Sequence, residues 1–259
     1  MNKTAAEPVI CVTGASSGIG LATARWFANK NYHLITAARR VDRLKGQASE
    51  LMRLGAASVL PLCLDIRSLD SISAFMAAVV ERHPEGPRIL INNAGLALGR
   101  ERLVDGKDED WLQMIQTNIT GTLWLTRAVL RQMLPNQIGH IVMVGSIAGH
   151  QVYEGGAVYC ATKHGMRAIS ETLKLELNGT GVRVSSIDPG MVETEFSLVR
   201  FHQNESEAKK VYQGITPLTA EDVAETIGFV VTRPPHVNID QIVLTPTDQA
   251  TVYKVHRHV

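Results

Sequence analysis

Short apolar runs alternate with longer amphipathic stretches along the chain, and this alternation limits the possible folds more than any other feature. We interpret seven runs as strands: 9–13, 33–38, 58–64, 88–93, 140–146, 182–188 and 241–245. Several of them are apolar at every position, which is typical of strands that helices cover on both faces. Repeated strand-helix alternation predicts an α/β fold with a doubly wound, seven-stranded parallel sheet.

The stretches between these runs predict helices. They lie near 18–30, 41–54, 69–82, 108–134, 157–178 and 219–232. Ser68 is a candidate N-cap, and Thr219 with Asp222 resembles a capping box. The least regular stretch, 190–217, is interpreted as a mobile flap near the substrate.

Composition limits the class of protein and its partners. The 259 residues carry a formal net charge of +1 and are 45% hydrophobic, so nucleic acid and anionic membranes are not expected as main partners. No apolar run is long enough to span a membrane, and the residues before the first strand lack the pattern of a signal peptide. We found no repeat or linker. We therefore expect a single cytoplasmic domain over 1–259, with a C-terminal tail over 246–259 and a small-molecule substrate.

Cysteine and histidine spacing indicates no metal site. Cys11, Cys63 and Cys160 have no metal-ligand spacing, and an odd number of thiols cannot pair fully within one chain. We expect Cys11 and Cys63 to be buried thiols and Cys160 to be a small packing residue. His256 and His258 have no evident acidic or thiol partner, so they are assigned to a structural tail.

A glycine-rich turn links the first expected strand to the first expected helix. Its candidate cofactor-binding residues are Gly14, Ser16, Ser17, Gly18, Ile19 and Gly20. The glycines have the spacing G-x-x-x-G-x-G. Glycine lets the backbone approach a pyrophosphate, and a helix N-terminus presents free N–H groups and a positive dipole end. The turn therefore predicts a dinucleotide site.

The end of the second expected strand indicates which dinucleotide is bound. An NAD site usually places an acid there for the ribose 2′-hydroxyl, but this strand ends in Ala37 and Ala38, followed by Arg39 and Arg40. Arginine can bind a 2′-phosphate with two hydrogen bonds, which favours NADP(H). The alternative is that both arginines are solvated charges at a strand end.

With these motifs in order, the chain resembles the short-chain dehydrogenase/reductase family over roughly residues 8 to 245. The resemblance rests on "TGASSGIG" at 13–20, "NNAG" at 92–95, Asn118, Ser146, "YCATK" at 159–163 and "DPG" at 188–190. It implies a single-domain Rossmann fold, an NADP-dependent oxidoreductase activity and a homotetramer or homodimer.

The resemblance also implies the catalytic roles. Tyr159 would exchange a proton with the substrate oxygen, and Lys163 would favour the phenolate by its charge and hold the nicotinamide ribose. Ser146 would hydrogen-bond the substrate oxygen. Asn118 would hold a water that links Lys163 to solvent.

Further cofactor contacts follow from the same resemblance. They are Asp65, Ile66, Asn92, Ala94, Gly95, Pro189, Gly190, Val192 and Thr194. Of these, Asp65 and Ile66 would lie at the adenine. Asn92 to Gly95 would support the sheet and the cofactor, and Pro189, Gly190 and Thr194 would lie near the nicotinamide.

A narrower resemblance concerns the substrate. "NNAGLALG", "GSIAGHQVYEGGAVYCATK", "TEFSLVRF" and "PPHVNID" look like the branch that oxidises serine, allo-threonine and other 3-hydroxy acids with NADP, with relatives that reduce malonic semialdehyde or sulfoacetaldehyde. Arg200 would then bind the carboxylate or sulfonate, and Tyr153 would add a hydroxyl. The alternative places Arg200 on the surface of the flap. Glu193 stands where a small residue is expected, which leaves open a substrate that carries an amine.

Two other functions remain open. One is a carbonyl reductase for neutral ketones and aldehydes. The other is a non-catalytic NADP-binding regulator, which the presence of both Tyr159 and Lys163 disfavours. The sequence does not distinguish among the individual 3-hydroxy acids, their stereochemistry or the physiological direction.

Overall fold

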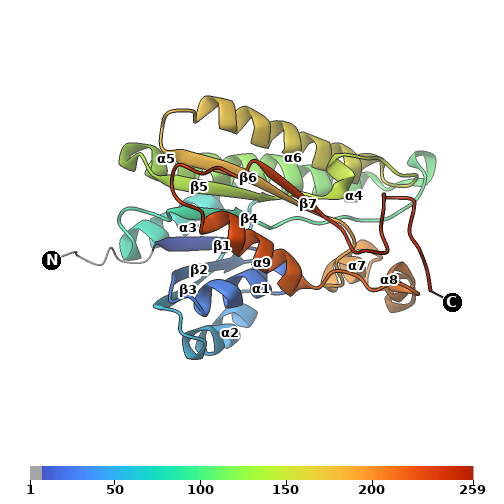
Figure 1. Cartoon of the computed structure of the whole chain (residues 1–259), viewed down its shortest axis with the longest axis horizontal. Helices are drawn as coiled ribbons and strands as arrows, with labels where there is room; N and C mark the ends of the chain where they lie inside the picture. The colour runs from blue at the N-terminus through green and yellow to red at the C-terminus, as the bar shows by residue number, and fades with distance from the viewer. Residues whose placement is uncertain (1–7, 259) are drawn as a thin grey trace.

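Seven parallel strands form one sheet in the order β3-β2-β1-β4-β5-β6-β7 (Figure 1). The structure is a computed structural model that describes residues 8–258. The strands are β1 (Val9–Thr13), β2 (His33–Ala38), β3 (Ser58–Cys63), β4 (Ile89–Asn92), β5 (Gly139–Val144), β6 (Val182–Pro189) and β7 (Gln241–Leu244). The predicted fold class and all seven expected strands are confirmed, with small shifts at their ends. The described residues do not include 1–7 or 259. The prediction of no signal peptide concerns residues 1–7, and residue 259 belongs to the predicted tail.

The order of the strands reverses between β1 and β4. β1 pairs with β2 on one side and with β4 on the other, and all pairings are parallel. The loops that follow β1 and β4 therefore leave the same edge of the sheet in opposite directions. Ligands of open α/β sheets bind at such a switch point.

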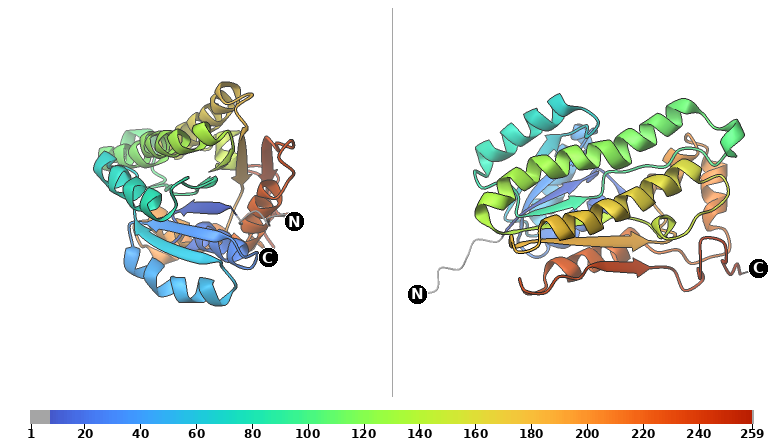
Figure 2. Two further views of the ribbon diagram at one scale, coloured as in Figure 1. Left: turned by 90° about the vertical axis from the view of Figure 1, so that its left-hand side faces the viewer. Right: turned by 90° about the horizontal axis from the view of Figure 1, so that it is seen from above.

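Helices cover both faces of the sheet (Figures 1 and 2). One face carries α1 (Gly18–Ala28), α2 (Val41–Arg53) and α9 (Ala220–Val231); the other carries α3 (Leu69–Arg82), α5 (Thr122–Asn136) and α6 (Ala157–Glu176). Phe27 and Val223 are fully buried in the first core, and Leu90 and Val129 are fully buried in the second. Because the strands bury residues toward both cores, they are apolar without alternation.

The predicted helix over 108–134 is interrupted. The structure divides it into α4 (Asp108–Ile115), a π-helical turn (η2, Gln116–Gly121) and α5. At Gly121 the helix passes so close to the loop after β3 that a Cβ would lie 2.7 Å from the carbonyl oxygen of Ile66. The turn contains Asn118, and such π-helical turns are frequent at functional sites.

The flap, residues 190–217, is more regular than expected. It contains two short helices, α7 (Glu195–Arg200) and α8 (Glu205–Tyr212), at one end of the molecule (Figure 1). Each is capped, because the side chain of Thr194 accepts a hydrogen bond from Phe196 N and that of Asn204 from Glu207 N. The mobility of the flap stays a prediction.

The C-terminal tail returns to the flap. The Oε1 atom of Gln249 accepts a hydrogen bond from Met191 N at 2.8 Å, and His258 N donates to Gly214 O at 2.6 Å. The rings of His256 and His258 stack edge to face. The Asp248 carboxylate binds His258, so the expectation that this histidine has no acidic partner is wrong. Within residues 8–258, no group of three or more His, Cys, Asp or Glu side chains is placed to hold a metal ion.

The three cysteines, the start of α9 and the apolar character of the helices were also predicted from the sequence. Cys11 and Cys160 are buried, but the expectation that Cys63 is buried is wrong. β3 is an edge strand, so Cys63 at its end has a neighbouring strand on one side only. The capping box of Thr219 and Asp222 at the start of α9 is confirmed. None of the helices in the described part of the chain is long and apolar enough to cross a membrane.

Candidate functional site

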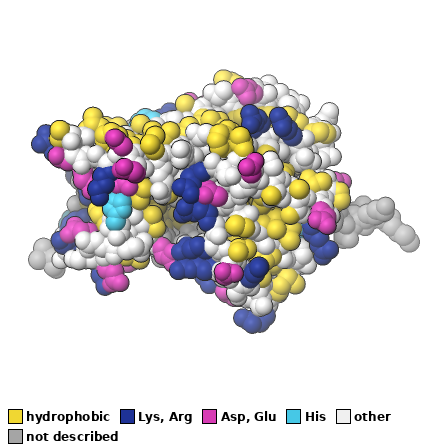
Figure 3. Space-filling model, turned by 180° about the vertical axis from the view of Figure 1, so that it is seen from behind, with side chains coloured by type: hydrophobic (Ala, Val, Ile, Leu, Met, Phe, Trp, Pro, Cys, Tyr) yellow, Lys and Arg dark blue, Asp and Glu magenta, His cyan; other side chains and the backbone are white. Residues whose placement is uncertain are grey.

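A cavity of about 470 Å³ lies where the loops after the strands meet the flap. Its wall contains these predicted site residues: Gly14, Ser16, Ser17, Gly18, Ile19, Arg39, Arg40, Asp65, Ile66, Ala94, Gly95, Ser146, Tyr153, Tyr159, Lys163, Pro189, Gly190, Val192, Thr194 and Arg200. Of the described residues predicted for the site, Gly20, Asn92 and Asn118 are not in this wall. From behind, basic and acidic side chains gather beside a hollow in the surface (Figure 3).

The turn after β1 forms one end of the cavity. Gly14 has φ +64° and Gly18 has φ +51°, a left-handed backbone that glycine adopts readily. A Cβ on Gly14 would lie 2.8 Å from Asn93 Nδ2. α1 begins at Gly18 with no side-chain cap, so its first N–H groups face the cavity without a side-chain acceptor. This backbone cradle fits a pyrophosphate.

Gly20 supports this turn from behind. A Cβ there would lie 2.5 Å from the carbonyl oxygen of Gly14. The first turn of α1 can therefore pack directly on the phosphate loop only with glycine at this position.

The two arginines after β2 differ in their contacts. Arg40 donates hydrogen bonds to Ser16 Oγ at 3.2 and 3.0 Å and to Ser17 Oγ at 2.8 Å. It also forms an ion pair with Glu195 at 3.0 Å. Arg39 is exposed in the cavity wall. Together, the cations and the serine hydroxyls form a site for an anion beside the phosphate loop.

Asp65 and Ile66 form the next part of the wall. Arg67 binds both carboxylate oxygens of Asp65, the shorter contact being 2.6 Å. These hydrogen bonds outweigh the effect of burial and hold the pKa of Asp65 below its usual value. Ile66 is buried.

Ser146, Tyr159 and Lys163 meet in the middle of the cavity. Ser146 follows β5, while Tyr159 and Lys163 lie one turn apart on α6. Tyr159 is only 8% exposed, and the Ser146 side chain is close enough to act on the pKa of its hydroxyl. The Lys163 ammonium donates to the carbonyl oxygen of Val144 at 2.9 Å and lies 5.9 Å from the centre of the Tyr159 ring.

Burial dominates the electrostatics of this pair. It raises the pKa of Tyr159 above its ordinary value, while the hydrogen bond from Ser146 and the charge of Arg200 act in the opposite direction. Burial also lowers the pKa of Lys163 to about 8, against the charge of Asp188. That Lys163 favours the phenolate stays a prediction, since the ammonium lies close to the Tyr159 ring but is itself desolvated and hydrogen-bonded to Val144.

Asn118 and Asn92 lie behind the wall. The Asn118 amide donates to Leu96 O at 2.8 Å and to Thr162 Oγ1 at 3.1 Å, and its oxygen accepts from Leu96 N at 3.0 Å. Asn92 is buried in the sheet and donates to Thr126 Oγ1 at 2.8 Å. Asn118 thus fixes the loop after β4, whereas Asn92 joins β4 to α5, and neither side chain lines the cavity.

α7 brings a cation to the other end of the cavity. Arg200 donates to the Tyr153 hydroxyl at 2.8 Å and to Gly99 O at 3.2 Å, and its guanidinium lies 5.7 Å from the centre of the Tyr159 ring. It therefore lies in the cavity wall rather than on the outer surface. Glu193 lines a neighbouring groove instead of the cavity, although burial and its charge both act to raise the pKa of Tyr212 in the cavity wall.

A family model described as "short chain dehydrogenase" matches residues 8–205. The chain belongs to the short-chain dehydrogenase family. The NADP-dependent 3-hydroxy acid dehydrogenase of Schizosaccharomyces pombe is 43% identical over 249 residues, which cover 96% of each chain. The sulfoacetaldehyde reductase of Chromohalobacter salexigens is 42% identical, over 93% of this chain and 94% of its own. Among solved structures, the closed form of serine dehydrogenase complexed with NADP⁺ superposes with a TM-score of 0.90 at 40% identity, over 96% of this chain and all of its own.

Two groups of ion-paired side chains in this short-chain dehydrogenase were not predicted. Arg43 and Arg40 both bind the carboxylate of Glu195, although 152 residues separate Arg43 from it. His150 binds the buried Asp188 carboxylate at 2.7 Å. Neither has a signal in the sequence, because the partners are 38 to 155 residues apart along the chain.

Proposed function

We propose that this protein is an NADP-dependent oxidoreductase that transfers a hydride between the nicotinamide and a small 3-hydroxy acid or its aldehyde. The observation that carries the proposal is the position of Arg200, whose guanidinium faces the Tyr159 ring in one cavity. A small substrate can then present its alcohol or aldehyde to Tyr159 and its anionic end to Arg200. The names of the relatives, a 3-hydroxy acid dehydrogenase and a sulfoacetaldehyde reductase, support the same substrate class.

The residues present fit the cofactor. Gly14 and Gly18 leave room for a pyrophosphate, Arg39 and Arg40 with Ser16 would bind the 2′-phosphate, and the remaining predicted wall residues would line the adenine and nicotinamide. When bound, NADP(H) supplies or accepts the hydride. The names of an NADP-dependent relative and an NADP⁺ complex support this choice.

The groups of the chain itself move the proton. In reduction the Tyr159 hydroxyl gives its proton to the aldehyde oxygen, and in oxidation the phenolate takes a proton from the alcohol. Ser146 donates a hydrogen bond to the same oxygen as charge develops there. The Lys163 ammonium would hold the nicotinamide ribose, and Asn118 would order a water behind it.

The pH dependence should differ between the two directions. Between about pH 6 and about pH 7, burial keeps Tyr159 protonated, and Lys163 is still mostly charged although burial lowers its pKa to about 8. We expect kcat/KM for reduction to stay flat and that for oxidation to rise about tenfold per pH unit, because only oxidation needs the rare phenolate. Initial rates in both directions would measure this. A flat oxidation profile with falling reduction would mean that Tyr159 is ionised in the free enzyme.

Removal of the Arg200 guanidinium should separate anionic from neutral substrates. We expect Arg200→Ala to raise KM for an anionic substrate by about 100-fold, because a charge-assisted pair is lost. The assay follows NADPH formation with L-serine, D-serine, L-allo-threonine, 3-hydroxypropionate, isethionate and a neutral alcohol, each also with NAD. Lys209→Ala, on the exposed side of α8, is the control.

The same assay tests the alternatives. The apolar Phe196 and Val199 in the cavity wall favour a carbonyl reductase for neutral substrates. That function would replace the proposal if the neutral alcohol reacts as well as the acids and Arg200→Ala changes nothing. A binding protein without activity would give no turnover with any substrate while still binding NADP.

We also propose that the chain is one cytoplasmic domain that assembles as a homotetramer or homodimer. Leu112 and Ile115 on α4 and Leu123 on α5 are more than 40% exposed, which is an apolar face suited to a second copy. Three free thiols suit a reducing compartment. Sedimentation would give the number of subunits.

A further inference from the structure

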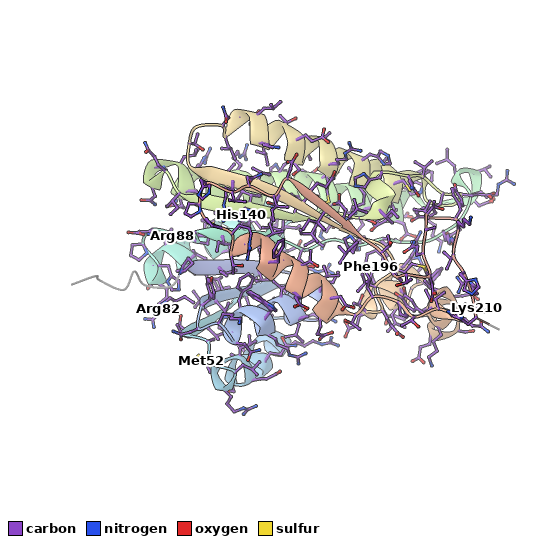
Figure 4. The ribbon with its side chains drawn as sticks, in the orientation of Figure 1. Met52, Arg82, Arg88, His140, Phe196 and Lys210 are labelled. Carbon is purple, nitrogen blue, oxygen red and sulfur yellow. The ribbon has the colours of Figure 1, made fainter. Side chains whose placement is uncertain are left out.

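α7 extends from the phosphate end of the cavity to its substrate end. Its first residue, Glu195, contacts the arginines after β2, and its last residue, Arg200, contacts Tyr153. Between them the Phe196 ring packs edge-on against Tyr159 with centroids 5.8 Å apart. Phe196 lies at the inner end of the flap, toward the sheet, while Lys210 lies at its outer end (Figure 4).

The Glu195 carboxylate has a cation on each oxygen. Arg40 binds Oε2 at 3.0 Å, and Arg43 binds Oε1 at 2.8 Å. Burial raises the pKa of Glu195, but the hydrogen bonds from the two arginines outweigh it and hold the pKa below the usual value. The carboxylate is therefore charged at neutral pH. With Arg39, three cations are close enough to this end of the cavity to balance both Glu195 and a phosphate dianion.

The guanidinium of Arg40 binds both the phosphate loop and the flap. Its Nη2 and Nε atoms bind the hydroxyls of Ser16 and Ser17 on the phosphate loop, while Nη1 binds Glu195 on the flap. Arg43 binds Glu195 but, among the described residues, makes no hydrogen bond to the phosphate loop. Arg40 thus joins the flap to the phosphate loop. Arg43 forms a second ion pair that holds the flap to α2.

We propose that Glu195 is a positioning residue that fastens the flap to Arg40 and Arg43, so that the arginines at the cofactor phosphate also set the places of Phe196 and Arg200 at the substrate. The proposal rests on the proposed function for its effect on catalysis. It assigns to Glu195 no contact with the reacting atoms. Loss of the ion pairs should therefore change substrate binding more than the chemical step.

The test compares Glu195→Gln and Arg43→Gln with Arg25→Gln, which breaks a similarly exposed ion pair with Glu50 on α1 and α2. In both test variants we expect KM for the anionic substrate to rise about threefold to tenfold, with kcat changed less than about twofold, as for lost partly exposed ion pairs. In the cofactor-free protein, amide hydrogen exchange over 194–203 should become faster. The Arg25→Gln control should change neither quantity.

The outcomes that would overturn the proposal are specific. Unchanged exchange and unchanged KM in Glu195→Gln would mean that the ion pairs do not position the flap. Tighter NADP binding with unchanged KM would mean that Glu195 only competes for the phosphate position. If the wild type oxidises no hydroxy acid, the proposed function fails, while hydrogen exchange still decides whether Glu195 holds the flap.

Discussion

Tyr159→Phe is expected to lower kcat for reduction by about 1,000-fold, the contribution of a well-placed general acid. The phenylalanine ring fills the same space on α6, and Phe196 can still pack against it. The substitution removes the hydroxyl that lies near Ser146 and would protonate the substrate oxygen. Neither the phosphate loop nor the arginines are altered, so NADP affinity should change little.

Steady-state rates with NADPH and the best aldehyde would measure this loss, and NADPH fluorescence titration would measure affinity. Tyr212→Phe is a matched control, because it removes a half-buried hydroxyl that bonds Ser197 and the carbonyl oxygen of Val192. It should lower the thermal midpoint without a comparable loss of kcat. A Tyr159→Phe enzyme within tenfold of wild type would exclude Tyr159 as the acid.

Replacement of both Arg39 and Arg40 by alanine is expected to weaken NADP binding by about 100-fold and NAD binding little, since charge-assisted contacts to the 2′-phosphate are lost. Titration of the substrate-free protein with NADP and with NAD measures both affinities. Arg67→Ala is the control, because Arg67 holds Asp65 at the expected adenine position and should affect both dinucleotides equally. Equal losses of NAD and NADP in the double variant would show that the arginines do not select the phosphate.

The sheet could be predicted because its information is local. Each strand is a short apolar run. Parallel strands that are buried on both faces can therefore be recognised from neighbouring residues alone, without knowledge of their contacts to distant parts of the chain. α7 and α8 could not be found in this way, since helices of six and eight residues are marginal alone. They depend on contacts such as that of Ser197 with Tyr212, which helical periodicity does not contain. The π-helical turn in the long helix could not be predicted either, because a hydrophobic pattern with a period of 3.6 residues does not distinguish it from an α-helix.

The candidate site could be predicted where motifs have fixed spacing. Ser146, Tyr159 and Lys163 follow one another closely along the chain, and the structure brings them together. The pair of Glu195 with Arg43 joins residues from opposite parts of the sequence, so only the fold identifies it. The pKa of Tyr159 depends on burial, which spacing alone does not give.

The edge position of β3 has a practical consequence. Burial raises the pKa of Cys11 to about 12 and also that of Cys160, so both thiols should react slowly with alkylating reagents, whereas Cys63 is exposed. The Cys63 sulfur lies 3.8 Å from the carbonyl oxygen of Arg39. A maleimide dye should therefore label the natural protein at one position, beside the expected phosphate site. Its emission would report cofactor binding without any engineered cysteine.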